Sequence, residues 1–298
     1  MRLLCGTGVL IACGLALAGC GDEPLPSAKR AAVINVEIDR VFSIEADGSG
    51  GEVLVATDRG LIRIDSDGRN PRQVPGVYRD RRGSTPMGAL SLAPGTPGTL
   101  LASGHPRAPT REFSETLGLV SSSDGGRRWE PVSLYGRADF HPLRRADARI
   151  YGFDFRQLKF LVTTDEGRTW KPLELPAPMY DFVVDPADPD RLAASTPAGL
   201  LESVDGGHRW LPSGKGGDDL RLAWPQTGRF YAAAKDGTVT TSDGPGSRGA
   251  PVGELPAKPQ TLTALDSDSL LAAVDGGRVV RSDDGGQSWR DWLLFAEP

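Results

Sequence analysis

The side chains best suited to bind a metal or a polar ligand are few in this sequence. Its 298 residues include three histidines and three methionines. His105, His141 and Met87 lie in segments that we expect to meet in one sector of the fold, and imidazole with thioether is a soft donor set that favours copper. Asp139 and His141 are two residues apart and lie on one side of a regular strand. A second interpretation is therefore an oriented His–Asp pair that contacts a polar ligand.

A structural role is the third interpretation of the same residues. In it His105 and His141 hydrogen-bond nearby loops and Met87 fills the core, and the residue types alone favour this plainer role. His208 belongs to an exposed turn. We expect other polar side chains to border the same region: Asp154, Arg156 and Asp181, together with Asp58, Tyr180, Arg221 and Asp236. The charged segment 79–82 is expected to be a solvated loop on the same rim.

A repeat predicts the elements that position these residues. Four segments match Ser/Thr-x-Asp-x-Gly-x-x-Trp, and weaker copies begin at Ile64 and Thr241. After a first interval of 58 residues, the copies recur every 38 to 41 residues. Asp and Gly form a tight turn, with Gly at positive φ, and the Trp packs against it. The repeat consists of Asp124, Gly126, Trp129; Asp165, Gly167, Trp170; Asp205, Gly207, Trp210; and Asp284, Gly286, Trp289.

The pattern resembles the Asp-box, or bacterial neuraminidase repeat, which marks the turn between the third and fourth strands of a propeller blade. Short apolar runs separated by Gly and Asp turns, such as 52–56 with 61–64 and 269–273 with 278–280, predict the preceding strands. We therefore expect an all-β, six-bladed β-propeller over residues 32–298. The alternating segment 33–38 is expected to pair beside 292–295 and close the ring. The Asp-box carboxylates are structural in this interpretation.

The resemblance also implies which face carries a site. In Asp-box propellers, ligands bind around the central mouth on the face opposite the Asp-box turns. The first interval is longer than the others, and its extra residues lie mostly in 103–118. An enlarged loop there favours a lid or specificity element. Residues 103–106 and 138–141 look like segments of bacterial propellers that are labelled glycosyl hydrolases by repeat content.

The first twenty residues predict export. A short basic start, an apolar stretch from Leu3 to Leu17 and small residues before Cys20 are typical of a secretory signal. The segment 17–20 resembles a bacterial lipoprotein box, which implies a signal peptide over 1–19, acylation of Cys20 and a flexible tether over 20–31. The other two cysteines, Cys5 and Cys13, lie within the signal, so no disulfide framework is expected. The predicted location is the bacterial cell envelope, on the outer side of the cytoplasmic membrane or on the outer membrane.

Composition excludes other classes. Gly 38 and Pro 24 are too frequent for a long helical bundle. The net charge of −5 is spread along the chain, which argues against a nucleic-acid partner. We expect a monomer.

Two functions remain open. The favoured one is a binding or assembly scaffold for a partner protein, a glycan or a metal-bearing ligand, and the sequence also resembles photosystem II assembly factors in its repeats. The alternative is a sialidase-like glycoside hydrolase. Its usual Arg-Ile-Pro signature is absent, because Arg40, Val41 and Phe42 occupy that region, and no pair of carboxylates stands out by spacing.

Overall fold

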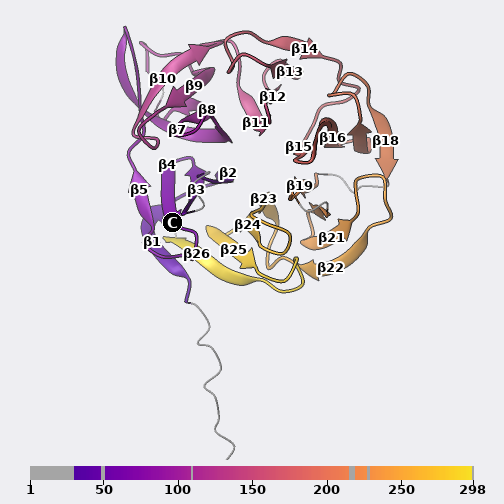
Figure 1. Ribbon diagram of the computed structural model, residues 1–298. Helices are drawn as coiled ribbons and strands as arrows, with labels where there is room; N and C mark the ends of the chain where they lie inside the picture. The colour runs from indigo at the N-terminus through magenta and orange to yellow at the C-terminus, as the bar shows by residue number, and fades with distance from the viewer. Residues whose placement is uncertain (1–29, 48–50, 109, 215–218, 227–228, 297–298) are drawn as a thin grey trace, which may run out of the picture.

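The strands of the chain form a ring of sheets (Figure 1). The computed structural model describes residues 30–47, 51–108, 110–214, 219–226 and 229–296. All regular elements in these ranges are β-strands, and none of the described segments is a helix long and apolar enough to cross a membrane. The predicted signal peptide, Cys20 and most of the tether lie outside the described residues.

Four sheets of the ring are four-stranded and open, with their strands in chain order. The first sheet holds β2 (Val41–Ala46), β3 (Glu52–Thr57), β4 (Gly60–Asp65) and β5 (Arg72–Val74). The others hold β11 (Phe140–Ala146), β12 (Arg149–Asp154), β13 (Lys159–Thr163) and β14 (Lys171–Leu173); β15 (Asp181–Asp185), β16 (Asp188–Thr196), β17 (Gly199–Ser203) and β18 (Leu211–Gly214); and β19 (Arg221–Ala223), β20 (Phe230–Ala233), β21 (Thr238–Ser242) and β22 (Ala250–Glu254).

A fifth open sheet joins the two ends of the chain. It contains β23 (Pro259–Ala264), β24 (Leu270–Val274), β25 (Arg278–Ser282) and β26 (Arg290–Ala296), with β1 (Ala32–Glu37) as its outer strand. β1 pairs in parallel with β26, and Val33 lies opposite Leu294. The indigo start of the chain therefore meets its yellow end in Figure 1. The expectation that residues 33–38 close the ring beside 292–295 is confirmed.

The expectation of six regular blades is wrong. Five sheets are open, and the remaining strands close on themselves: β6 (Val77–Asp80), β7 (Gly83–Pro94), β8 (Leu100–Pro106), β9 (Leu119–Ser122) and β10 (Arg128–Ser133). β7 is long enough to pair with β6 along its first part and with β8 along its second. Because β6 also pairs in parallel with β10, the sheet has no free edge. Residues 79–82, expected as a loop, belong to the β6–β7 hairpin.

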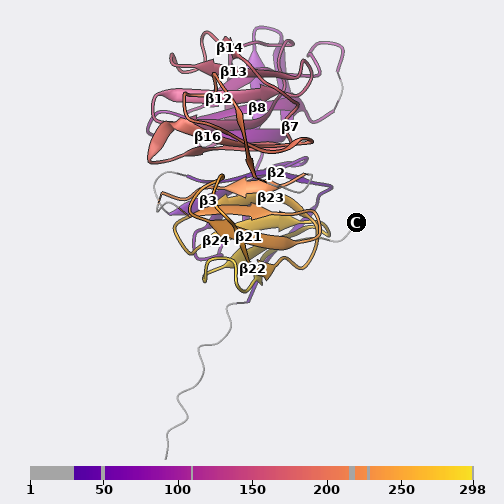
Figure 2. The same ribbon diagram turned by 90° about the vertical axis from the view of Figure 1, so that its right-hand side faces the viewer.

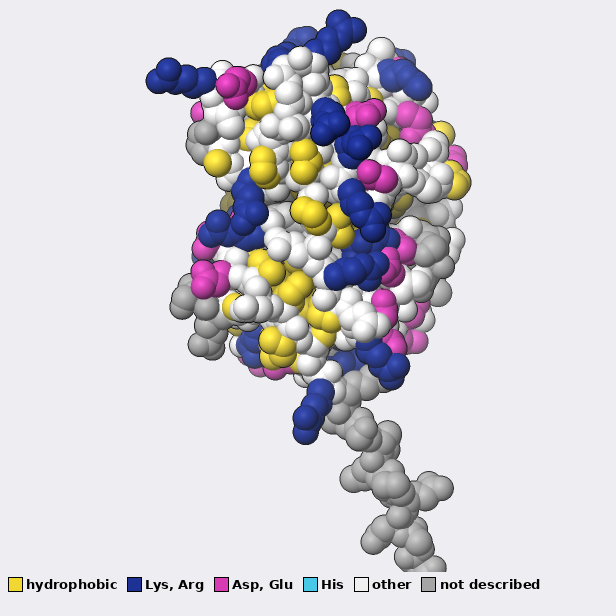
Figure 3. Space-filling model, turned by 90° about the vertical axis from the view of Figure 1, so that its left-hand side faces the viewer, with side chains coloured by type: hydrophobic (Ala, Val, Ile, Leu, Met, Phe, Trp, Pro, Cys, Tyr) yellow, Lys and Arg dark blue, Asp and Glu magenta, His cyan; other side chains and the backbone are white. Residues whose placement is uncertain are grey.

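The first strands of the sheets surround the centre of the ring. β2, β7, β11, β15, β19 and β23 each contact the next in this order, and β23 contacts β2. Figure 2 shows the ring from the side, with β2 and β23 close together. Apolar clusters fill the spaces between neighbouring sheets, such as that of Ile62, Trp292 and Leu293. On the outer face in Figure 3, basic and acidic side chains are interspersed, and hydrophobic ones occur in scattered groups.

The four Ser/Thr-x-Asp-x-Gly-x-x-Trp segments, called the repeated turns below, each join the last two strands of a sheet. In the first, Ser122 Oγ accepts the Gly126 N–H at 2.9 Å and Asp124 Oδ1 accepts the Arg128 N–H at 2.9 Å. Trp129 Nε1 donates to the Gly126 carbonyl oxygen at 2.8 Å. The same three hydrogen bonds recur in the other three turns. The Gly at the motif position has a φ of 79° to 89° in all four, a region that favours glycine.

Candidate functional site

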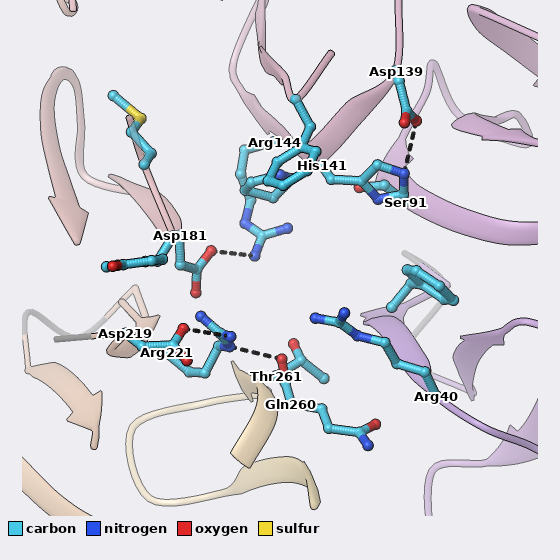
Figure 4. Close-up of a pocket in the computed structure, with 15 residues that line it drawn as sticks. Arg40, Ser91, Asp139, His141, Arg144, Asp181, Asp219, Arg221, Gln260 and Thr261 are labelled. Carbon is cyan, nitrogen blue, oxygen red and sulfur yellow. Dashed lines mark hydrogen bonds and ion pairs between the residues drawn. The ribbon is translucent and has the colours of Figure 1, made fainter. Parts of the chain in front are cut away.

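A cavity of about 390 Å³ opens at the centre of the ring. We call it the mouth cavity (Figure 4). Most of its lining comes from the first strands of the sheets and from the residues just before them, because these segments surround the ring axis. The lining residues are Arg40, Phe42, Ser91, Asp139, His141, Pro142, Arg144, Phe155, Met179, Tyr180, Asp181, Asp219, Arg221, Gln260 and Thr261.

Two histidines converge on one carboxylate in the wall of this cavity. His105 Nε2 and His141 Nε2 lie 3.1 Å and 2.8 Å from the same oxygen, Asp139 Oδ1. The two imidazole rings are nearly parallel, with an interplanar angle of 15°. His105 comes from β8, and Asp139 and His141 flank the first residue of β11, so two neighbouring sheets build the group. Asp139 is 7% exposed, and its Oδ1 has no hydrogen bond of normal geometry among the described residues.

In this group the carboxylate of Asp139 and the imidazole of His105 each shift the other's pKa toward the charged form. Burial acts to raise the pKa of Asp139, but the two imidazoles outweigh it and hold that pKa well below its usual range. The Asp139 carboxylate in turn raises the pKa of His105 against the opposing effect of burial. The backbone around Asp139 is also fixed, because Asp154 Oδ1 accepts its N–H at 3.2 Å and Ser103 Oγ accepts the N–H of Phe140 at 3.0 Å.

Three arginines from alternate inner strands face the same cavity. Arg40 directly precedes β2, Arg144 lies in β11 and Arg221 begins β19. Figure 4 shows the three side chains directed toward the centre from different sides. Arg144 Nη2 lies 3.3 Å from Asp181 Oδ1, and Arg221 Nη2 lies 2.7 Å from Asp219 Oδ1.

Arg40 differs from the other two arginines. Its guanidinium has no carboxylate within ion-pair distance among the residues that the structure describes, and it lies 5.4 Å from the centre of the Phe42 ring. The side chain is exposed. Partial burial, and then the positive charge of Arg221, lower its pKa, and the more distant carboxylates of Asp219 and Asp275 oppose this in part. The segment is held in place by Asp58 Oδ1, which accepts the N–H groups of Asp39 and Arg40 at 3.0 Å and 3.2 Å.

Two acidic side chains flank Arg144 at the centre of the ring. Asp181 Oδ2 accepts the Leu222 N–H at 2.9 Å and thereby ties β15 to β19. Burial raises the pKa of Asp181. Burial also raises the pKa of Glu45 to about 7, although Arg144 opposes it. Glu45 Oε1 lies 3.8 Å from Arg144 Nη1, so this carboxyl group is only weakly compensated.

Several residues predicted for the site have other positions. Met87 is 1% exposed and packs in an apolar cluster with Leu54 and Tyr78, so it does not supply the third donor beside the two imidazoles; Asp139 does. Asp154 Oδ1 binds the backbone N–H groups of Asp139 and Arg156 and so has a structural role.

Of the other residues predicted to border the cavity, some line it and some do not. Arg156 is exposed beside the cavity and its charge acts on His105. Asp236 lies in the exposed β20–β21 turn and does not line the cavity. Tyr180 and Arg221 do line it, as expected.

Sequence reasoning missed Glu45, Arg144, Asp219 and Gln260, and it gave Arg40 no role. One signal was present for two of the arginines. Arg40 and Arg221 both occur within one residue of the start of a first strand, where side chains reach the mouth of the ring. Arg144 and Glu45 lie within strands, and no motif distinguishes them.

No family model matches the chain, and no curated protein matches it in sequence. Solved structures do resemble it. YCF48 from Cyanidioschyzon merolae has a TM-score of 0.52 and 15% identity, covering 84% of each chain. The GH74 xyloglucanase from Xanthomonas campestris has a TM-score of 0.56 and 21% identity, covering 86% of this chain and 38% of that one. An ancestral GH74 enzyme has a TM-score of 0.55 and 13% identity, covering 81% of this chain and 36% of that one.

These likenesses show the β-propeller fold. The chain spans less than two fifths of either GH74 enzyme. At such low identities the comparison says nothing of activity, so function has to be argued from the residues of the mouth cavity.

Proposed function

We propose that the protein is an Asp-box β-propeller, held on the outer side of a bacterial membrane by a lipid on Cys20, that binds an anionic group of a partner protein or glycan in the mouth cavity. The observation that carries this proposal is the guanidinium of Arg40. It is exposed, faces the cavity and lacks a carboxylate partner among the described residues, whereas Arg144 and Arg221 are paired. A guanidinium in this state is suited to a carboxylate or phosphate.

The carboxylates of the cavity favour binding over hydrolysis. Asp139, Asp181 and Asp219 each lie within ion-pair distance of a cationic or protonatable side chain. A glycosidase needs two carboxyl groups that face the scissile bond, one of them able to give up a proton. Each of these three carboxylates therefore already faces a basic side chain of the protein, and no two of them are free to act as an acid and base pair.

The partner can be sought by crosslinking in cells. A photo-crosslinking amino acid at Tyr180, which is 41% exposed in the cavity wall, should give a discrete adduct. The same group at Val204, 68% exposed in a repeated turn, should not. Arg40→Met should lower the adduct yield by about tenfold or more, the effect of ~1.4 kcal/mol in affinity. Arg209→Met, which removes an exposed arginine elsewhere, is the matched control. Equal yields with Arg40 and with Met at this position would contradict the proposal.

Glycoside hydrolysis is the second candidate. Glu45, which does not line the mouth cavity but borders two other pockets, is the observation that favours it. A carboxyl group with a pKa of about 7 remains protonated near neutral pH, as a general acid must. Release of reducing sugar from xyloglucan or a sialylated glycan, lost in Glu45→Gln and retained in Glu130→Gln, would establish this function instead.

The anchor is tested separately. Cys20→Ser should move the protein from the membrane fraction to the soluble fraction. Continued membrane retention of this variant would contradict the lipid anchor and leave the binding site untouched.

A further inference from the structure

Three metal-ligating atoms lie close together in the wall of the mouth cavity. One ring nitrogen of His105, one of His141 and a carboxylate oxygen of Asp139 are all within 4.8 Å of one another. A first-row metal ion about 2.0–2.1 Å from each ligand needs neighbouring ligand atoms roughly 2.9–3.4 Å apart. The two histidine–aspartate distances, 3.1 Å and 2.8 Å, are close to this range. The two ring nitrogens lie within 4.8 Å of each other, and binding of one ion would bring them to about 3.4 Å.

The hydrogen bonding of His105 shows which of its nitrogens is free to bind. Its Nδ1 lies 2.7 Å from the backbone carbonyl oxygen of Glu115. A carbonyl oxygen only accepts, so Nδ1 carries the proton, and in the neutral imidazole Nε2 has a lone pair. That lone pair meets the Asp139 carboxylate at 3.1 Å. Two acceptors at this distance repel unless a second proton or a cation lies between them.

Asp139 provides the independent observation. Its residue is more than nine-tenths buried, and Oδ1 has no hydrogen bond of normal geometry in the described part of the chain although two ring nitrogens are close to it. A buried carboxylate oxygen whose nearby ring nitrogens are poorly aligned for hydrogen bonding is incompletely satisfied, and this costs free energy. A metal-binding histidine usually donates its other ring N–H to a carbonyl or a carboxylate, and His105 Nδ1 is placed to do this with the Glu115 carbonyl.

The geometry points to a binding site for one divalent first-row transition metal ion, of the class of Zn²⁺, formed by His105, Asp139 and His141. Two nitrogens and one oxygen are a borderline donor set. The thioether of Met87 is packed in the core, so this set lacks the soft donor on which the copper interpretation of the sequence depended.

The ion would lie in the wall of the mouth cavity, because Asp139 and His141 line it. Three protein ligands leave at least one coordination position open. This inference rests on the proposed function, and it adds a second contact for the same anionic group near Arg40, since His141 and Arg40 both lie against the Phe42 ring.

The test is a metal titration of the full chain. The protein carries Cys5→Ser, Cys13→Ser and Cys20→Ser and has no histidine tag, so that neither thiols nor a tag compete. Zn²⁺ in equilibrium dialysis should bind at about one equivalent per chain. His105→Ala and His141→Ala should each weaken binding by about 100-fold or more, since even supporting residues contribute ~10–100-fold. His208→Ala, the remaining histidine, is exposed and should leave binding unchanged.

A second measurement avoids dependence on the folding of variants. Co²⁺ added to the unmutated site should produce visible absorption bands that saturate at one equivalent and disappear when Zn²⁺ is added. Absence of saturable binding of either ion, or loss of binding in His208→Ala alone, would overturn the proposal and leave an imidazolium–carboxylate cluster. Because the titration contains no anionic ligand, it can fail while the crosslink that depends on Arg40 persists, so the two proposals fail separately.

Discussion

The repeated turns and the mouth cavity both contain buried or half-buried charged and polar groups, but they differ in how these groups are satisfied. In each repeated turn the Asp carboxylate accepts backbone N–H groups of its own turn, within four residues. In the mouth cavity the partners come from other sheets, as when Asp181 binds Leu222 N–H. Asp139 Oδ1 lies close to two ring nitrogens but has no hydrogen bond of normal geometry among the described residues.

The difference separates stability from binding. Hydrogen bonds from the hydroxyl and then the backbone N–H of Thr169 hold the pKa of Asp165 below its usual range, because this carboxylate already bonds within the turn. Arg40 and the His105–Asp139–His141 group are less satisfied within the protein and have capacity left for a ligand. The repeated motif therefore identifies turns that stabilise the fold, whereas the residues of the mouth cavity belong to no motif.

The largest expected effect is a loss of stability on removing a tryptophan from a repeated turn. Trp129→Ala should lower the free energy of unfolding by ~3–5 kcal/mol, because it removes a fully buried indole that bonds the Gly126 carbonyl. Trp210→Ala, at the same place in a turn where the indole is only partly buried, should cost about half as much. Urea unfolding measures both. Equal losses would mean that burial does not distinguish the turns.

The next effect concerns Glu45 at the centre of the ring. Its carboxyl group is protonated in the folded chain up to about pH 7 but in the unfolded chain only up to about pH 4.5. The folded state binds more protons between these values, so stability should fall as pH rises from 4.5 to 7, by roughly 2–3 kcal/mol. Glu45→Gln should remove this part of the slope, with Glu130→Gln as the exposed control. Urea unfolding at a series of pH values would contradict the assignment if the two variants had the same profile.

Ser122→Ala tests one hydrogen-bonding group of a repeated turn. The substitution leaves the buried Gly126 N–H without its acceptor, and we expect a loss of ~1–2 kcal/mol. Ser123→Ala, the exposed neighbour, should change stability by less than about 0.5 kcal/mol. Thermal unfolding of both variants compares them directly. If Ser122→Ala left the stability unchanged, water would have replaced the hydroxyl as the acceptor of the Gly126 N–H.

The smallest effect on stability is expected in the mouth cavity. Arg40→Met removes a charge that faces Arg221 without a carboxylate partner among the described residues. After solvent screening the free energy of unfolding should stay the same or rise by at most ~1 kcal/mol. The same variant should lose the Tyr180 crosslink. A marked loss of stability would give Arg40 a role in the fold and weaken the contrast between the two regions.

Structural features that depend on interactions within a few residues could be predicted from the sequence, and most features that depend on distant strands could not. The hairpins 52–57 with 60–65 and 270–274 with 278–282 agree with the apolar runs and Gly or Asp turns, because turn chemistry acts within a few residues. The β1–β26 pairing was also predictable from a single alternating segment. The closed sheet over residues 77–133 was not, since nothing in the length of β7 says that β6 will pair with β10.

By itself the sequence determined the repeated turns, the hairpins that precede them and the pairing of the two ends of the chain. Only the tertiary structure decided that Arg40, Arg144 and Arg221 share one cavity and that His105, Asp139 and His141 meet at one oxygen. Only burial in the assembled ring raises the pKa of Glu45 to about 7. The physical reason is that a turn is stabilised by groups adjacent in the chain, whereas charge, burial and convergence at the centre of a ring depend on strands that are tens to hundreds of residues apart.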